Sequence, residues 1–302
     1  MQKIKMHTEE IEIDESLVKR LVTVQFPEWA ELPGQQVTSS GTDNALFRLG
    51  SDKVVRLPRI YWAVDQISLE WEWLPKLAPH LPLPISKPLA LGSPTGEYAW
   101  NWAIYQWIEG EIATYEHIAE PLRFAKELGE FILALQRVDT VGIALSTNRG
   151  VPLIRRDRET CKAIDSCKDI LSDTINNTSL TIWKTSLQLP AWRNPPVWTH
   201  ADLQAGNLLV REGQLSAVID FGCMGVGDPA CELIVAWNLF TAEMREVLKE
   251  TLKVDEATWL RGRAWALSVA FIALPYYVNT SPTIANASRR TIMEAVNDYL
   301  TD

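Results

Sequence analysis

Three oxygen-bearing side chains in the second half of the sequence have the types and spacing that phosphoryl transfer requires. Asp202, in the run His200-Ala201-Asp202, is followed after four residues by Asn207, and Asp220 opens the triplet Asp220-Phe221-Gly222. Transfer from ATP needs a hard divalent cation such as Mg²⁺, which binds carboxylate and carbonyl oxygens. The acceptor hydroxyl needs a carboxylate that orients it and accepts its proton. The pattern therefore predicts Asp202 as the catalytic base and Asn207 and Asp220 as metal ligands.

The segments around these residues predict a hairpin that brings the two metal ligands together. A short apolar strand ends at Val210 and a second covers Leu215–Ile219, with the turn Arg211–Gly213 between them. Asn207 leads into the first strand and Asp220 follows the second. The ordered set matches the general kinase pattern, HxD, four residues, Asn, and then DFG. The alternative is that these are turn residues whose side chains only cap strand ends.

The run that contains these motifs is similar to the core of the aminoglycoside phosphotransferase-like kinases, a family that includes macrolide and choline kinases. The family's usual form is close to HGDLHPGNLL, then IDFG, then GDPA, and here the chain reads HADLQAGNLL, IDFG and GDPA. Ala201 replaces the usual glycine and Gln204 a frequent histidine or lysine, but neither supplies a catalytic oxygen. The resemblance extends from Gly41 to the last helix. It implies an α+β, two-lobed protein-kinase-like fold, with a small antiparallel-sheet N-lobe and a larger helical C-lobe.

The resemblance also implies which residues hold the phosphates. Ser40 and Gly41 lie in a turn cluster between two expected strands, like the phosphate-covering loop of the family, although an ordinary hairpin turn is the alternative. Arg56, in KVVRLP, lies where many kinases have a phosphate-binding lysine, and its guanidinium can bind phosphate oxygens as a fork. Lys53 is the rival for this role.

Further positions follow from the same resemblance. Glu70, or else Glu72, is expected to pair with the phosphate-binding arginine. Adenine is expected to bind the backbone of a hinge that contains Gln106, Trp107 and Ile108.

Three more residues near the motifs have expected roles. His200 should brace the catalytic loop by hydrogen bonding. Asp228 should hold the loop after DFG or cap the helix that begins at Pro229. Glu232 is a weaker candidate for a residue that faces the acceptor.

Hydrophobic periodicity predicts a sheet-rich region followed by a helical one. We place the nucleotide-binding lobe at residues 1–106 and the helical lobe, with the catalytic loop and acceptor site, at residues 107–302. Pro27 should limit a first helix containing Leu17, Leu21 and Val24, and Pro75 should end a helix that begins near Val64. The expected strands are Gln36–Thr38, Ala45–Leu49, Lys53–Leu57, Leu89–Leu91 and Ala99–Trp107. A later helix is expected to begin at Pro121. The helices expected after it cover Arg156–Asn176, Pro229–Phe240, Ala242–Leu252, Ala257–Pro275 and Thr283–Leu300.

The composition limits the class of protein. The chain has 302 residues, 47% apolar and 22% charged, as in an ordinary globular protein. Its formal net charge of -9 argues against nucleic acid as a partner, because an acidic surface repels phosphate backbones. It would suit a cationic acceptor, or it could only aid solubility. Four cysteines without a CxxC pair and four histidines argue against a zinc site.

No segment predicts secretion or a membrane anchor. Residues 1–14 lack the apolar core of a signal peptide. The apolar stretch at residues 264–278 is too short to span a bilayer, and Pro275 interrupts it. We therefore expect a cytoplasmic protein with no membrane partner, and no motif indicates an obligatory protein partner.

The leading hypothesis is an ATP- and Mg²⁺-dependent phosphotransferase that acts on a hydroxyl of a small molecule, first of all an aminoglycoside-type antibiotic. The alternatives are a kinase of a macrolide, choline, a sugar or an amino alcohol, and a non-catalytic nucleotide-binding pseudokinase. A protein kinase is disfavoured, because only six residues separate Gly222 from Pro229 and leave no room for a long activation loop. No motif specifies the acceptor, the hydroxyl modified, the choice between ATP and GTP, or the oligomeric state.

Overall fold

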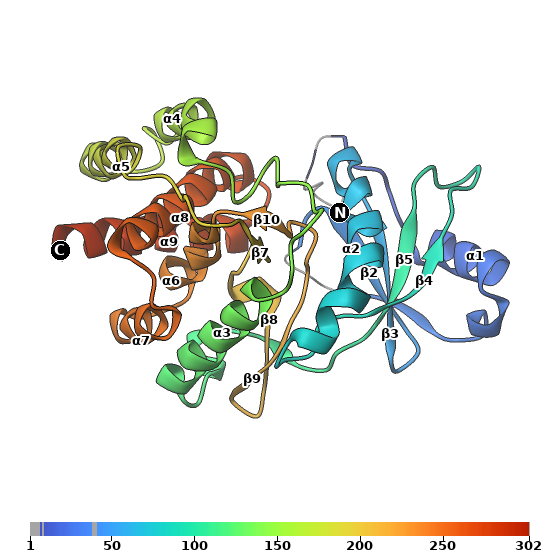
Figure 1. The fold of residues 1–302 in the computed structure, drawn as a ribbon. Helices are drawn as coiled ribbons and strands as arrows, with labels where there is room; N and C mark the ends of the chain where they lie inside the picture. Colours follow the sequence, from blue (N-terminus) through green and yellow to red (C-terminus); the bar gives the residue numbers. More distant parts are fainter. Residues whose placement is uncertain (1–6, 8, 38–40, 302) are drawn as a thin grey trace. The chain divides into compact units, whose positions relative to one another are not determined.

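The computed structural model describes residues 7, 9–37 and 41–301, which form two compact units (Figure 1). The first unit comprises Met1–Gly110 together with Ala217–Gly222, and the second comprises Glu111–Ser216 together with Cys223–Asp302. The first is built on an antiparallel sheet and the second is mostly helical. The predicted α+β, kinase-like architecture is thus confirmed. The first unit takes in the segment that carries Asp220, which a boundary at residue 106 leaves out.

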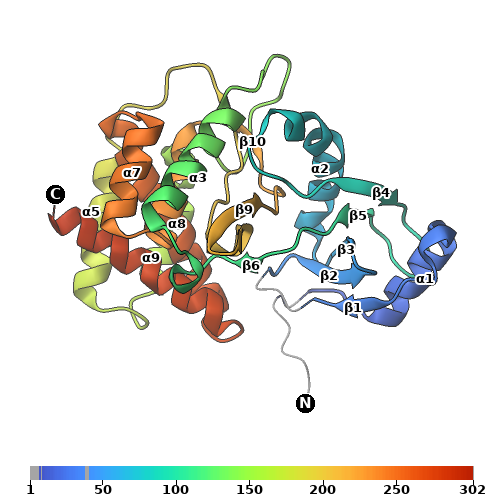
Figure 2. The same ribbon diagram turned by 90° about the horizontal axis from the view of Figure 1, so that it is seen from below.

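The sheet of the first unit has five antiparallel strands in the order β1-β2-β3-β5-β4 (Figure 2). The predicted meander of the first three strands is confirmed, and Leu46 and Ala103 lie opposite Arg56 on either side. The first strand begins and ends earlier than Gln36–Thr38, and Thr38 lies outside the described residues. The strands are β1 Gly34–Gln36, β2 Asn44–Leu49, β3 Lys53–Pro58, β4 Pro88–Gly92 and β5 Trp102–Gln106.

Helix α1 (Glu15–Gln25) covers an apolar part of this sheet. Asp14 caps its N-terminus by accepting a hydrogen bond from the backbone N–H of Leu17. Its buried side chains include Leu17 and Leu21, which join one apolar cluster with strand residues such as Phe47. Val24, predicted on the same face, is 76% exposed. The apolar stripe uses Val18 and Val22 instead.

Helix α2 (Val64–Leu77) runs past the predicted stop at Pro75. A proline removes one helical hydrogen bond, but by continuing past it the helix places Leu77 in the core, where it is fully buried. Ile67 is fully buried on this helix, whereas Trp71 is 39% exposed. The buried polar position on this helix is Glu70.

The second unit contains seven α-helices among the residues that the structure describes. The proline at the first turn of α3 is confirmed. The segment predicted as one helix from Arg156 to Asn176 is two helices, because the chain turns between Cys167 and Ser172. The helices are α3 Pro121–Gln136, α4 Asp157–Ser166, α5 Asp173–Ser186, α6 Ile234–Asn238, α7 Ala242–Leu252, α8 Glu256–Tyr277 and α9 Pro282–Thr301.

Two small sheets hold the loop that carries the motifs. Strands β6 (Glu111–Ile112), β8 (Leu208–Arg211) and β9 (Gln214–Val218) form one sheet, in the order β6-β8-β9. Strands β7 (Val197–Thr199) and β10 (Gly225–Gly227) pair antiparallel, with Thr199 opposite Gly225. The sequence predicted neither β7 nor β10, which are too short to show an alternating pattern. Their pairing fixes the point at which the loop beginning at His200 leaves the unit's core.

None of the helices in the described part of the chain is both long and apolar enough to cross a membrane.

Candidate active site

Arg56, on β3, forms the centre of a buried ionic cluster in the first unit. Its Nη1 donates to Glu70 Oε1 at 2.7 Å and to Oε2 at 2.8 Å. Its Nη2 donates to Asp220 Oδ1 at 2.8 Å. The predicted ion pair with Glu70 is therefore present. The two rivals are engaged elsewhere, because Lys53 pairs with Asp52 and Glu72 with Lys76.

Three residues that sequence reasoning missed complete this cluster. Tyr105 donates its hydroxyl to Glu70 Oε2 at 2.7 Å, and Gln66 Oε1 lies 3.3 Å from Arg56 Nη2. With its side-chain amide turned so that the oxygen faces Arg56, Asn44 accepts from Nε at 3.1 Å and Nη2 at 2.9 Å. Asn44 and Tyr105 lie on β2 and β5, the strands that pair with β3, and Gln66 lies on helix α2, so only the folded unit reveals them.

Burial and charge act against each other in this cluster. Burial alone would lower the pKa of Arg56, but the negative charges of Asp220 and Glu70 outweigh it and raise the pKa. Burial raises the pKa of the Tyr105 hydroxyl well above its ordinary value, so this group stays a neutral donor. The guanidinium therefore stays charged, and it orients two carboxylates that would otherwise repel each other.

Asp220 adopts a left-handed backbone conformation, with φ of 61°. This is an uncommon conformation for a residue other than glycine, and it concentrates at functional positions. Gly222, two residues on, packs closely, since a Cβ there would lie 2.6 Å from Gln66 Oε1. The close packing explains the glycine of the DFG triplet.

The predicted adenine-binding segment uses part of its backbone within its own unit. The N–H of Gln106 donates to the carbonyl of Lys87, and the carbonyl of Gln106 accepts from the hydroxyl of Ser86. The N–H of Trp107 donates to the carbonyl of Asp52 at 2.8 Å. Of the three predicted residues, Ile108 is the one whose N–H makes no hydrogen bond among the described residues. Adenine binding here stays a prediction, and its donor would be Ile108.

Ser40, predicted in the phosphate-covering loop, lies outside the described residues. Gly41 is described and exposed, and it precedes β2. Its predicted contact with phosphate stays a prediction.

Asp202, in the second unit, is held by two amides through one carboxylate oxygen. Gln204 Nε2 donates to Asp202 Oδ2 at 3.0 Å, and Asn207 Nδ2 donates to the same oxygen at 3.1 Å. Asn207 Nδ2 also donates to the backbone carbonyl of Asp202 at 2.8 Å. The predicted catalytic and metal-binding residues of this loop therefore touch each other. Gln204, a departure from the family pattern, helps to orient the carboxylate of Asp202.

The loop is braced from beneath by Glu232 and His200. The backbone N–H of Ala201 donates to Glu232 Oε1 at 2.5 Å, and the N–H of Asp202 donates to His200 Nδ1 at 3.3 Å. His200 matches its predicted bracing role, whereas Glu232 holds the backbone of the loop. Ala201 has φ of 66°, the left-handed region that favours glycine, which explains the glycine usual in the family. Burial raises the pKa of Glu232 to about 7.

Asp228 both caps a helix and forms a buried ion pair. Its Oδ1 accepts from the backbone N–H of Ala230 at the start of the 3₁₀ helix Pro229–Leu233, which confirms the predicted cap. Arg261, on α8, donates from Nε to Asp228 Oδ2 at 2.9 Å and from Nη2 to Oδ1 at 3.2 Å. This pair ties the segment after DFG to the longest helix of the unit.

Arg149 is the residue near Asp202 that sequence reasoning missed. Its Nη2 lies 3.4 Å from Asp202 Oδ1, the oxygen that the two amides do not use. It comes from the connection between α3 and α4, more than fifty positions before the motif. No motif contains it, so only the folded chain shows that it reaches the catalytic loop.

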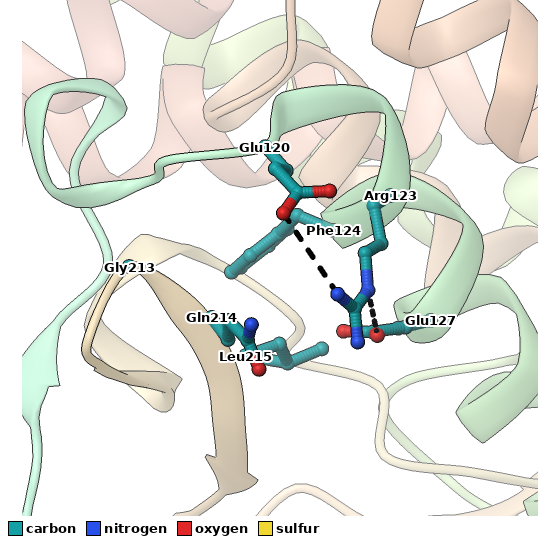
Figure 3. A pocket seen from close by; sticks show the side chains of 7 residues that line it. All are labelled: Glu120, Arg123, Phe124, Glu127, Gly213, Gln214 and Leu215. Carbon is teal, nitrogen blue, oxygen red and sulfur yellow. Dashed lines mark hydrogen bonds and ion pairs between the residues drawn. The ribbon is translucent and has the colours of Figure 1, made fainter.

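Figure 3 shows a shallow hollow elsewhere on the second unit, at the start of α3. Arg123 lies in it with its guanidinium directed at Glu120 and Glu127, at 3.8 and 2.7 Å. The hollow contains none of the predicted site residues and its own charges are paired, so we assign it no ligand.

The metal pair draws one residue from each unit, Asn207 from the second and Asp220 from the first. Their joint binding of an ion stays a prediction. Within the described ranges, no three histidine, cysteine, aspartate or glutamate side chains gather as a ready metal site.

A family model described as "Phosphotransferase enzyme family" matches residues 34–265, which include every motif described above. The chain belongs to this family. It is therefore a phosphotransferase, as the HxD, Asn and DFG pattern predicted. No curated protein sequence matches the chain.

Several solved phosphotransferase structures have the same fold as this chain but differ widely from it in sequence. A GDP complex of aminoglycoside 2'-phosphotransferase-IIIa aligns with TM-score 0.77 at 15% identity, over 95% of this chain and 100% of its own. A streptomycin-ATP ternary complex of an APH(2'')-IIa enzyme aligns with TM-score 0.62 at 19% identity, over 97% of each chain. A macrolide 2'-phosphotransferase from Brachybacterium faecium aligns with TM-score 0.61 at 18% identity, over 92% of this chain and 98% of its own.

Proposed function

We propose that this phosphotransferase moves the γ-phosphoryl group of ATP, in the presence of Mg²⁺, to a hydroxyl group of a small molecule. The observation that carries the proposal is the arrangement of Asp202, Gln204 and Asn207, in which two amides fix one carboxylate oxygen of Asp202. The other oxygen, Oδ1, makes its polar contact only with Arg149 among the described residues. It is the oxygen that would orient the acceptor hydroxyl and take up its proton.

The residues present fit a magnesium ion. Asn207 spends its Nδ2 on Asp202, which leaves its Oδ1 for a cation. Asp220 uses Oδ1 with Arg56, which leaves its Oδ2. Both are hard oxygens of the kind that Mg²⁺ prefers. The ion, when bound, would neutralise charge on the phosphates during transfer.

The cluster of the first unit suits a supporting role toward the nucleotide. Arg56 holds Asp220 in place and carries a positive charge that its surroundings keep. We propose that this charge steadies the phosphates while Ser40 and Gly41 cover them. We also propose that adenine binds the hinge segment through the backbone of Trp107 and Ile108.

The identity of the acceptor is a separate hypothesis. The similar structures are those of aminoglycoside and macrolide phosphotransferases, and one of them holds streptomycin with ATP. An aminoglycoside-type acceptor, as the sequence suggested, is therefore the first to test, and a macrolide is the second. A role in antibiotic resistance would follow from either, and a cytoplasmic location would suit both.

Release of ADP or GDP by the purified chain tests the proposal. The chain would be mixed with Mg-ATP or Mg-GTP and with aminoglycosides, macrolides, choline, sugars and hydroxy acids in turn. We expect nucleoside diphosphate release that depends on both Mg²⁺ and one class of acceptor. Tight binding of Mg-ATP without transfer to any acceptor would indicate a nucleotide-binding pseudokinase and overturn the proposal.

A further inference from the structure

Arg149 approaches the loop that carries Asp202 with one unsatisfied hydrogen-bond donor. Its Nη2 contacts Asp202 Oδ1, while its Nη1 is buried and has no hydrogen-bond partner among the described residues. A buried donor without a partner is costly, and more so when it is charged. Such a group is expected to gain a partner when the site is occupied.

The backbone fixes the position of this arginine. On one side of it, the N–H of Ser146 donates to the carbonyl of Val226 at 2.9 Å. On the other, the carbonyl of Gly150 accepts from the N–H of Asp228 at 2.8 Å. Gly227 packs so closely against Gly150 that a Cβ there would lie 2.5 Å from its carbonyl oxygen. Arg149 is thus held from a braced loop.

A second buried arginine lies nearby. Arg156 is 8% exposed, and its Nε donates to the hydroxyl of Ser268 at 3.0 Å. Burial lowers its pKa to about 10, and the positive charge of Arg149 adds to the effect, so the two charges are close enough to repel. Its acidic neighbour is Glu159, 3.5 Å away, whose side chain is 59% exposed and well screened by water.

Two guanidinium groups thus lie near Asp202, and the carboxylates closest to them are Asp202 itself and the exposed Glu159. The other acidic groups near the loop are already committed: Glu232 to the backbone of the loop and Asp228 to Arg261. A polycationic acceptor would have to bring its positive charge close to two guanidinium groups, one of them buried. A carboxylate or phosphate would instead supply the partner that Arg149 lacks, in the fork geometry that arginine favours.

We propose that Arg149, supported by Arg156, binds an anionic group that the acceptor carries close to its reactive hydroxyl. This inference rests on the proposed function and names its substrate class: a small hydroxylated acid or phosphate ester. The oxygen of Asp202 that faces Arg149 is the one that the amides of Gln204 and Asn207 leave open. The hydroxyl and the anionic group of one acceptor would thus bind side by side.

The same chemistry would suit the γ-phosphoryl group of the nucleotide, so the test must separate the two sources. Binding of Mg-ADP to the wild-type chain is measured first, by titration calorimetry, because its absence would count against the proposed function itself. With Mg-ADP saturating, three matched probes are then titrated: glycerol 3-phosphate, glycerol and 3-amino-1,2-propanediol. They share a diol and differ in charge.

We expect glycerol 3-phosphate to bind at least about tenfold more tightly than the other two probes. Arg149→Gln should lose this preference, and Arg149→Lys should keep part of it because the charge remains. Arg158→Gln, which removes an exposed arginine of α4, should leave it unchanged. Thermal unfolding of each variant checks that it is folded. If Arg149→Gln is not folded, the preference of Arg149→Lys for glycerol 3-phosphate tests the inference instead.

Three results would overturn the inference. The first is equal binding of the three probes, or no binding of the phosphate ester up to about 10 mM. The second is a preference for the anion that Arg149→Gln does not change. The third is a loss, in Arg149→Gln, of affinity for a non-hydrolysable Mg-ATP analogue with Mg-ADP affinity unchanged, which would assign Arg149 to the γ-phosphoryl group.

Discussion

The Arg56 cluster of the first unit and the loop 200–207 of the second differ in how fully their polar groups are paired. In the cluster every nitrogen of the Arg56 guanidinium has an acceptor, and Glu70 accepts from both an arginine and a tyrosine. Around the loop, two buried atoms have no hydrogen-bond partner within the described ranges: Glu232 Oε2 and Arg149 Nη1.

This difference in pairing distinguishes the Arg56 cluster, which is already held in one geometry, from the loop 200–207, around which polar groups remain unpaired. A saturated network holds one geometry without any ligand, because every rearrangement breaks a buried charged hydrogen bond. An unsaturated one leaves groups that either change protonation, as Glu232 can, or await a partner, as we infer for Arg149. Apart from the proposed contacts of Asp220 and Arg56 with the metal and the phosphates, the first region is therefore expected to respond to mutation mainly in stability. The second is expected to respond mainly in turnover and pH dependence.

The largest effect should come from Asp202→Ala, with Asp220→Ala as its counterpart in the other region. Loss of the base should lower kcat on the order of 10²–10⁴-fold while Mg-ATP binding is nearly kept. Asp220→Ala should weaken Mg-ATP binding as well, because it removes a proposed metal ligand. Steady-state kinetics and calorimetric titration of Mg-ATP measure the two effects. Wild-type turnover by Asp202→Ala would remove the assigned role.

Removing Arg56, the centre of the saturated cluster, should give the next largest effect, which should appear in the free energy of unfolding. Arg56→Met leaves Glu70 buried without its charged partner, which should lower the free energy of unfolding by about 3–5 kcal/mol. Adding Glu70→Gln should recover part of the loss, because the buried negative charge is removed too. Urea unfolding measures both.

A matched control for Arg56→Met is Arg48→Met, on the neighbouring strand. Arg48 pairs with Glu109, whose side chain is 60% exposed, and such a pair contributes roughly 0–1 kcal/mol. Equal losses at the two positions would show that burial of the ion pair is not the reason for the cost.

The pH dependence of stability should reflect the ionisation of Glu232, whose Oε2 has no hydrogen-bond partner among the described residues. Burial raises the pKa of Glu232 from 4.5 to about 7, so the folded chain holds this proton more tightly than the unfolded chain. Below pH 4.5 Glu232 is protonated in both the folded and the unfolded chain, and its contribution to the free energy of unfolding is fully present. It is then lost as the pH rises to about 7, by an amount on the order of 3 kcal/mol.

Glu232→Gln tests this, since glutamine keeps an oxygen for the N–H of Ala201 but cannot ionise. Relative to the wild type, the variant should gain stability as the pH rises from 4.5 to 7 and show no further relative change above that. Urea midpoints of both proteins across this range give the difference, and the other titrating groups cancel. Parallel curves would mean that Glu232 ionises normally in the folded chain.

The smallest effect is expected at Ala201. Its left-handed conformation costs an alanine about 1–2 kcal/mol, which glycine would relieve, while the loss of a buried methyl group costs roughly 0.8 kcal/mol. Ala201→Gly should therefore change stability by less than about 1 kcal/mol. Ala236→Gly, a buried alanine in α6, should cost about 2 kcal/mol, since no strain is relieved. Thermal unfolding compares the two, and equal losses would argue against strain at Ala201.

The features that depend on neighbouring residues could be predicted from the order of the residues alone. Turn residues between apolar runs predicted β2, β3 and the hairpin of β8 and β9, and periodicity predicted α7 from Ala242 to Leu252 as the structure has it. The ordered motif of Asp202, Asn207 and Asp220 predicted a phosphotransferase, because its chemistry is written in residue types and short spacings.

The distant side chains that surround these motifs could be identified only in the folded chain. Asn44, Tyr105 and Arg149 lie far from their partners in sequence, and nothing local marks them as polar groups of a site. Pro75 looked like a helix end because a proline breaks a local hydrogen bond, yet the helix continues to Leu77, whose side chain is fully buried. Local patterns fix the elements, whereas ion pairs across them arise only when the chain packs.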